Sequence, residues 1–169
     1  MRKALYILAD LEDRDLLWLN QAGRVLSLSA GQALIDAGRD VTDLFFVIDG
    51  EFAVTLPNGQ TIARLATGDV AGEMSFVEKR APGASVIATN AAQVLAVGRQ
   101  AMLSQFAADT AFAARFYRAL AVFLSDRLRT ATGGSSGAAE ELDEGILDTL
   151  HVAGDRFTRL MDLLAGRAH

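Results

Sequence analysis

Between Val25 and about Gly98, short apolar runs alternate with single glycines, and this alternation constrains the fold more than any other feature of the sequence. The runs are rich in Val, Ile, Leu and Phe, which favour β-strands, and glycine readily forms the tight turns that end strands. Many short strands separated by turns indicate a compact β-sandwich or barrel rather than alternating strands and helices. The glycines are Gly31, Gly38, Gly50, Gly59, Gly68 and Gly72.

Parts of this region can be predicted in more detail. Residues 44–48, Leu-Phe-Phe-Val-Ile, form the run that has the character of a fully buried strand. Residues 52–56 and 61–65 flank Pro57-Asn58-Gly59-Gln60, and Asn-Gly between two strand-like runs is a strong signal for a β-hairpin. Residues 85–97 continue the strand pattern.

Helical periodicity flanks the strand region on both sides. Residues 1 to about 22 have the leucine spacing of one helix face, and helical periodicity returns at Arg99, with a second helix that should run to about Ala131. The second helix carries an apolar stripe that is typical of a packing surface, either against the strands or in a dimer. The stripe consists of Phe112, Phe116, Leu120, Phe123, Leu124 and Leu128.

The chain beyond this helix changes in composition. A Gly- and Ser-rich stretch indicates a linker, and the last thirty or so residues are acidic, with apolar spacing that predicts short amphipathic helices. We therefore predict a main domain at residues 1–132, a linker at residues 133–139 and an acidic helical tail at residues 140–169.

Composition excludes several classes of function. The chain has no Cys, and its two histidines, His151 and His169, both lie in the tail, so thiolate or His-rich metal sites and a Ser–His nucleophile have little support. No phosphate-binding loop of the GxxxxGK[ST] form is present. We therefore expect no enzyme activity and no cofactor.

Charge and hydropathy narrow the possible partners. The net charge is −5, which gives no general attraction for nucleic acid, so DNA is not an expected partner. The apolar stretch at residues 4–9 is too short for a membrane span and is followed by acidic residues where a signal peptide would have small ones. These features predict a cytoplasmic protein without a membrane segment.

The segment Gly68-Asp69-Val70-Ala71-Gly72-Glu73-Met74-Ser75 is the most informative motif. A glycine turn that leads into a helical turn exposes backbone N–H groups in one direction, and such a concavity can bind an anion such as a phosphate. Glu73 has a second interpretation, because a carboxylate is also favoured at the start of any helix.

With its glycines, its 44–50 strand and this motif, the sequence from about Leu11 to Arg129 resembles the cyclic nucleotide-binding domain family. This family includes the catabolite activator protein, the regulatory subunits of cyclic-AMP-dependent protein kinase and cyclic-nucleotide-gated channels. The resemblance implies a mainly β fold: an eight-stranded β-roll of the jelly-roll (double-stranded β-helix) type with flanking helices, a long C-terminal helix and a short helical tail.

The resemblance also implies a ligand site for cyclic AMP or cyclic GMP. Glu73 would accept a hydrogen bond from the ribose 2′-hydroxyl, between backbone contacts of Gly72 and Met74. Ala84 and Ser85 would lie beside the phosphate and base. The wall would contain Val54, Ile62 and Ala63, and the long helix would cover the base, with Thr130 as a contact.

One position departs from the family pattern. Where the family has the arginine that binds the cyclic phosphate, in Pro-Arg-(Ala/Ser)-Ala-(Thr/Ser)-Val, this chain has Pro82. Proline supplies neither charge nor a backbone N–H. The loss of one charge-assisted contact costs about 1.5–3 kcal/mol of binding free energy. Arg80 is the nearest candidate to replace the missing charge.

Three functions are compatible with these features. The first is a stand-alone regulatory or sensor module that binds a cyclic nucleotide, most plausibly cyclic AMP, and signals through its C-terminal helix and tail. The second is a degenerate, ligand-independent module that dimerises or binds an unknown protein. The third, a truncated transcription regulator of the catabolite activator type, is disfavoured because the 37 residues after Thr132 are acidic. In each case a homodimer through residues 112–128 is expected.

Overall fold

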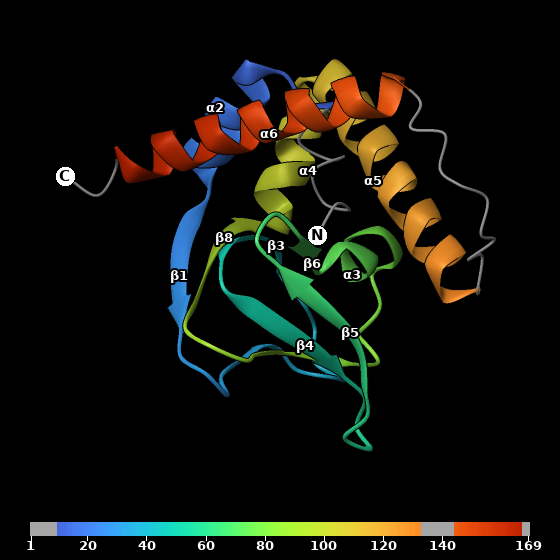
Figure 1. Ribbon diagram of the computed structural model, residues 1–169. Helices are drawn as coiled ribbons and strands as arrows, with labels where there is room; N and C mark the ends of the chain where they lie inside the picture. The colour runs from blue at the N-terminus through green and yellow to red at the C-terminus, as the bar shows by residue number, and fades with distance from the viewer. Residues whose placement is uncertain (1–9, 133–143, 167–169) are drawn as a thin grey trace. The chain divides into compact units, whose positions relative to one another are not determined.

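The structure, a computed structural model, describes residues 10–132 and 144–166. Within these residues the chain forms eight strands and five helices (Figure 1). The strands are β1 Arg24–Leu28, β2 Ala33–Ile35, β3 Asp43–Asp49, β4 Glu51–Thr55, β5 Thr61–Ala66, β6 Val70–Ala71, β7 Ser85–Ala88 and β8 Ala92–Gly98. The helices are α2 Asp13–Ala22, α3 Glu73–Glu78, α4 Arg99–Ala108, α5 Thr110–Ala131 and α6 Glu144–Ala165.

The strands form two antiparallel four-stranded sheets, in the orders β1-β8-β3-β6 and β2-β7-β4-β5. Side chains from both sheets meet in one buried cluster that includes Phe45, Val47, Phe52 and Val94. Apart from β4 and β5, all neighbouring strands are non-consecutive in the chain, as in a jelly roll. The predicted fold class, mainly β with flanking helices, is confirmed.

The two most specific strand predictions are also confirmed. All five residues of the 44–48 run are buried in β3. Strands β4 and β5 pair across the Asn58-Gly59 turn, in which the Leu56 N–H donates to the Gln60 carbonyl at 2.9 Å. Gly59 has a φ of 87°, a left-handed conformation that glycine adopts without strain.

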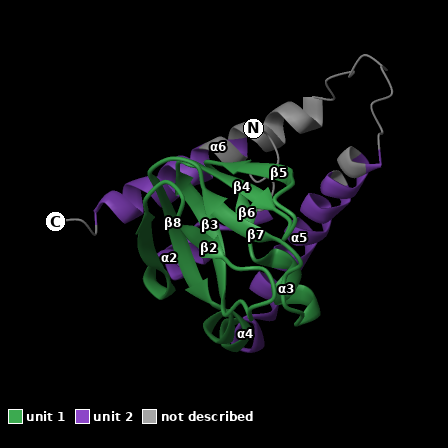
Figure 2. Ribbon diagram, turned by 90° about the horizontal axis from the view of Figure 1, so that it is seen from below, with its two compact units in different colours: residues 1, 21–105 green, residues 2–20, 106–169 purple. Residues whose placement is uncertain are grey.

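The chain divides into two compact units, residues 1 with 21–105 and residues 2–20 with 106–169 (Figure 2). The first unit holds the strands, α3 and most of α4, and the second holds most of α2 together with α5 and α6. The predicted linker lies outside the described residues, so the boundaries proposed at 132 and 139 stay a prediction.

The helical stretch expected from Arg99 is divided at Asp109, and the long helix α5 begins at Thr110. The Asp109 side chain caps the helix by accepting a hydrogen bond from the Phe112 N–H at 2.9 Å, and this bond lowers the pKa of the Asp109 carboxyl. The apolar stripe of α5 is buried: Phe112, Phe116, Leu120 and Phe123 are each at most 2% exposed. The ring of Trp18 contacts that of Phe112 within the same unit.

This burial corrects the predicted dimer interface. The four buried stripe residues pack inside one chain, so they are not available to a second copy. Of the other two stripe residues, Leu124 is half-buried and Leu128 has 64% of its surface exposed.

A buried ion pair links α2 to α5. Asp15 is 2% exposed and accepts hydrogen bonds from Arg115 Nε at 2.8 Å and Nη2 at 2.9 Å. The bond to Asp15 raises the pKa of the Arg115 guanidinium, so the guanidinium stays charged. The Asp15 carboxylate also accepts from the Glu12 N–H at 2.8 Å, just before α2 begins.

The tail forms one continuous helix, and the prediction of short helices was wrong. Helix α6 runs for 22 residues. The apolar positions Leu150 and Phe157 are seven residues apart, which is two helical turns, so one stripe continues through the interval. Leu160 and Leu164 are buried, and Arg159 forms an ion pair with Asp13 of α2 in the same unit.

Candidate functional site

The glycine motif folds into a tight turn between β6 and α3. Gly72 precedes α3 with a φ of 86°, and no side chain caps the helix. A Cβ at this position would lie 2.9 Å from the Asp43 carbonyl oxygen and 3.3 Å from Val41 Cγ1. Glycine is therefore required here for both its conformation and its small size.

The two residues after Gly72 differ sharply in burial. Glu73 is 3% exposed, whereas Met74 is 57% exposed. A carboxylate in the first turn of a helix is stabilised by the helix dipole, which offsets part of the cost of burying it. The structure thus buries the Glu73 side chain inside the first unit and leaves the Met74 side chain at the surface.

The other end of this segment, at Pro82 and Ser85, is held by the turn that follows β2. The Gly38 N–H donates to the Pro82 carbonyl at 2.8 Å, and the Ala37 N–H donates to Ser85 Oγ at 2.9 Å. Residues 36–42, which we call the β2–β3 loop, thus lie against both ends of the 72–85 segment, because Val41 adjoins Gly72, as does Asp43 at the start of β3.

The predicted wall residues are only partly brought together. Val54 of β4 pairs with Ala63 of β5, so their side chains point to the same face of the sheet. Ile62 lies at a register shift beside this pair and is 53% exposed.

The remaining predicted ligand residues are Ala84, Arg80 and Thr130. Ala84, just before β7, is half-buried. The Arg80 side chain is 82% exposed and lies 4.0 Å from Glu78, a loose surface pair that leaves it mobile in solvent. Thr130 belongs to α5, but its side chain is not among the described ones.

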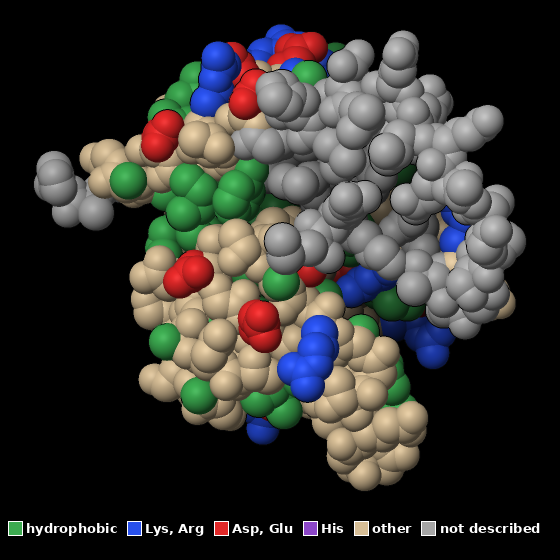
Figure 3. All heavy atoms as spheres, viewed as in Figure 1, with side chains coloured by type: hydrophobic (Ala, Val, Ile, Leu, Met, Phe, Trp, Pro, Cys, Tyr) green, Lys and Arg blue, Asp and Glu red, His purple; other side chains and the backbone are tan. Residues whose placement is uncertain are grey.

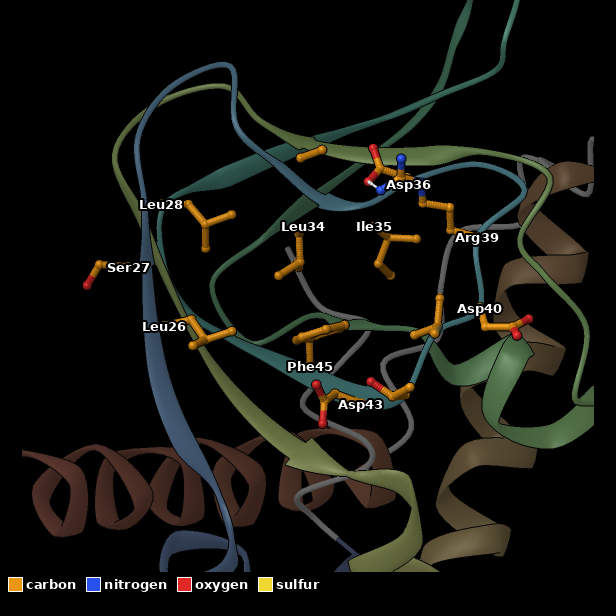
Figure 4. A pocket seen from close by; sticks show the side chains of 13 residues that line it. Leu26, Ser27, Leu28, Leu34, Ile35, Asp36, Arg39, Asp40, Asp43 and Phe45 are labelled. Atoms are coloured by element: carbon orange, nitrogen blue, oxygen red, sulfur yellow. Dashed lines mark ion pairs between the residues drawn. The ribbon is translucent and has the colours of Figure 1, made fainter.

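A pocket that the sequence did not predict opens beside the β2–β3 loop (Figure 4). Its volume is about 430 Å³, and its lining comes from β1, β2, the loop and the start of β3. None of the eleven predicted ligand residues lines it. Leu26 and Leu28 are separated by Ser27 in β1, so the sequence indicates that both leucines lie on one face of the strand. Only the tertiary structure shows that this face borders a pocket.

Acidic and basic groups are mixed over the described surface. In the β2–β3 loop Asp36 lies 3.8 Å from Arg39, and at the start of β3 Asp43 is held by Arg24 at 2.7 Å. On the face drawn in Figure 3, basic and acidic side chains of the described residues are interspersed rather than gathered into a basic area. The part of the chain that the structure describes holds no group of three or more potential metal ligands, and none of its helices is long and apolar enough to span a membrane.

The family model for the cyclic nucleotide-binding domain matches residues 25–109, half of the chain. The chain belongs to the cyclic nucleotide-binding domain family. The matched region contains the complete turn at Gly72, both contacts of the β2–β3 loop and Pro82. The predicted resemblance is therefore confirmed, and with it a cyclic nucleotide-binding domain of the regulator type.

The curated relatives that this chain matches are much longer proteins. The chain is 27% identical over 118 residues to uncharacterised NTE family proteins of Mycobacterium tuberculosis and Mycobacterium bovis. The match covers 70% of this chain but 20% of theirs, so the chain spans about a fifth of the length of these relatives.

Solved structures show the same fold. A cyclic nucleotide-binding domain from Methylobacillus flagellatus has a TM-score of 0.69 at 21% identity, covering 76% of this chain and 78% of its own. The catabolite activator protein of Thermus thermophilus has a TM-score of 0.64 at 20% identity, covering 96% and 88%. The regulatory subunit of a cAMP-independent protein kinase A from Trypanosoma brucei has a TM-score of 0.56 at 21% identity, covering 75% and 41%.

Proposed function

We propose that this domain is a regulatory module that binds a cyclic nucleotide, cyclic AMP in the first place, with low affinity at the Gly72–Ser85 segment. The observation that carries the proposal is the conformation of the segment itself. Gly72 is left-handed and closely packed, and Glu73 is buried directly after it, as binding of the ribose through a protected carboxylate requires.

Ser85 supports the phosphate end of this site. Its Oγ accepts a hydrogen bond from the Ala37 N–H, and a hydroxyl that accepts one bond can still donate its own proton. A phosphate oxygen beside Ser85 would therefore find a donor without breaking the bond to the loop.

The low affinity follows from Pro82. A guanidinium at this position would offer two parallel N–H donors to the phosphate, and proline offers none. Arg80 is a weak substitute, because an exposed arginine must lose side-chain freedom and hydration to bind. We infer a dissociation constant in the micromolar range or above.

Arg99 connects the proposed site to helix α4. It is the first residue of α4, and its Nη2 donates to the Phe76 carbonyl of α3 at 3.2 Å. Its backbone N–H donates to the Thr42 carbonyl at 2.8 Å. A ligand that shifts α3 would therefore also act on the start of α4, and so bias the helices between two arrangements.

Titration calorimetry with cyclic AMP and cyclic GMP tests the proposal directly. We expect weak binding of cyclic AMP to the wild-type domain and a further loss with Glu73→Gln, which keeps the side-chain volume but weakens the acceptor. A folded wild-type domain that shows no binding of either nucleotide at millimolar concentration would contradict the proposal. Unchanged binding in Glu73→Gln would reject the ribose contact.

The second candidate is a ligand-independent interaction or dimerisation module. Pro82 favours it, and so does the likeness in fold to a kinase regulatory subunit that is described as cAMP-independent. An absence of nucleotide binding together with stable self-association would establish this function instead. A homodimer and a cytoplasmic location stay proposals under either function.

A further inference from the structure

The pocket beside the β2–β3 loop lies between the free edges of the two sheets. Strand β1 is the end strand of one sheet, and β2 is the end strand of the other. Because no further strand covers either edge within the described residues, the interior of the sandwich is open between them. The resulting volume of about 430 Å³ lies in the range of small-molecule sites, which is about 300–1,000 Å³.

Apolar side chains form the inner surface of this pocket. Leu26 and Leu28 from β1, Leu34 from β2 and Phe45 from β3 point into the same space in Figure 4. Leu26, Leu28 and Leu34 are only partly buried although they pack against the core cluster, so apolar surface remains for a ligand to cover. An occupant must therefore have an apolar body.

Carboxylates dominate the rim. Asp36, Asp40 and Asp43 line the pocket, against Arg39 as the basic residue of the lining. Arg24 neutralises Asp43, while Arg39 contacts Asp36 at 3.8 Å with both side chains exposed. Among the described residues, Asp40 takes part in no ion pair or hydrogen bond. The rim thus keeps an excess of negative charge that a cation would offset.

We propose that this pocket is a binding site for an amphipathic organic cation, an amine on an aromatic or aliphatic body. The body fills the space between Leu28, Leu34 and Phe45, and the ammonium group lies at the rim near Asp36 and Asp40. The site does not depend on the proposed nucleotide function, because none of the predicted nucleotide contacts lines it.

Three probes of one shape and different charge test the proposal. Tryptamine is the cation, its alcohol analogue tryptophol is neutral, and indole-3-propionate is the anion. In two-dimensional NMR titrations of the full chain, tryptamine should bind most tightly and should shift the amides of β1, β2 and the β2–β3 loop. We expect its affinity to exceed that of tryptophol by about fivefold, which is the value of one exposed charge pair.

Two variants and a matched control localise the site. Ala33→Trp adds a large ring at the exposed mouth of the pocket and should abolish binding of all three probes in a domain whose NMR spectrum is otherwise that of the folded protein. Asp40→Asn should lower the affinity for tryptamine and leave that for tryptophol unchanged. Asp49→Asn removes the same charge from an exposed position outside the pocket and should change neither.

Equal affinity for the three probes would overturn the cation preference. Shifts centred on other elements, or retained binding in folded Ala33→Trp, would overturn the location. An equal effect of Asp40→Asn and Asp49→Asn would show that only the net charge of the protein matters, which also contradicts the proposal. Nucleotide titrations of the same samples keep the two sites distinguishable.

Discussion

At the scale of single residues, the affinity of the proposed site for a phosphate depends on the residue at position 82. The backbone of Pro82 is integrated into the fold, since its carbonyl accepts from the Gly38 N–H, but its side chain cannot contact an anion by charge. The proposed phosphate site therefore lacks the charged group that would give it strength.

Restoring that group is the most direct test of the proposed site. Pro82→Arg should tighten binding of cyclic AMP by about 1.5–3 kcal/mol, measured by calorimetry, because a charge-assisted contact is added. The tighter binding should weaken with rising salt, since ions screen the new pair. Arg80→Gln is the control and should change the wild-type affinity little. A folded Pro82→Arg domain with no gain would show that the phosphate is not held beside this residue.

At the scale of elements, the buried Asp15–Arg115 pair joins α2 to α5. Arg115→Met would leave the Asp15 carboxylate buried without its partner, and this should lower the free energy of unfolding by about 3–5 kcal/mol in urea titrations. The double variant Asp15→Asn with Arg115→Met removes the stranded charge and keeps an acceptor for the Glu12 N–H. It should be more stable than Arg115→Met alone. Equal stability of the two variants would mean that the charge is solvated.

The cap of α5 gives the domain a defined response to acid. The hydrogen bond from the Phe112 N–H lowers the pKa of Asp109 below its ordinary value of 3.8. The stabilisation by the carboxylate is thus fully present above pH 3.8 and is lost as the pH falls through the lower, folded-state pKa. Asp109→Ala should reduce the melting temperature at neutral pH, and the difference from wild type should shrink below pH 3.8. A constant difference across this range would contradict the role of the charge.

The elements that could be predicted from the sequence are those whose signals are local. Asn58-Gly59 specifies its hairpin within four residues, and Asp109 marks the start of α5 by its own capping chemistry. The pairing of Asp15 with Arg115 spans a hundred positions, and no local pattern indicates it. The same holds for the pocket, because its lining is assembled from two sheet edges and a loop.

Part of the candidate site could be predicted for the same reason. Gly72 and Glu73 belong to a contiguous motif, and the structure shows the expected turn at Gly72 leading into a helix, whereas the ligand contacts of both residues stay a prediction. The hydrogen bond from the Gly38 N–H to the Pro82 carbonyl could not be predicted, because it joins two turns that are more than forty residues apart in the sequence.

At the scale of the whole molecule, the burial of the stripe leaves only exposed residues of α5 for any self-association along this helix. If the domain forms a homodimer along this helix, Leu128→Glu should yield monomers by light scattering while the melting temperature stays unchanged, because this side chain is 64% exposed. Phe116→Glu should instead unfold the domain, since it places a charge where the native ring is fully buried. A Leu128→Glu protein that remains dimeric would exclude this part of the helix as the interface.

The β2–β3 loop contacts both the proposed nucleotide-binding segment and the pocket. It contacts Gly72, Pro82 and Ser85 on one side, and its Asp36 and Asp40 line the pocket on the other. Two ligands that each prefer one position of a shared loop are thermodynamically linked. If one ligand changes the affinity for the other by some factor, the second changes the affinity for the first by the same factor. An amine in the pocket would therefore set the nucleotide concentration at which the domain responds, and the nucleotide would set the response to the amine by the same factor.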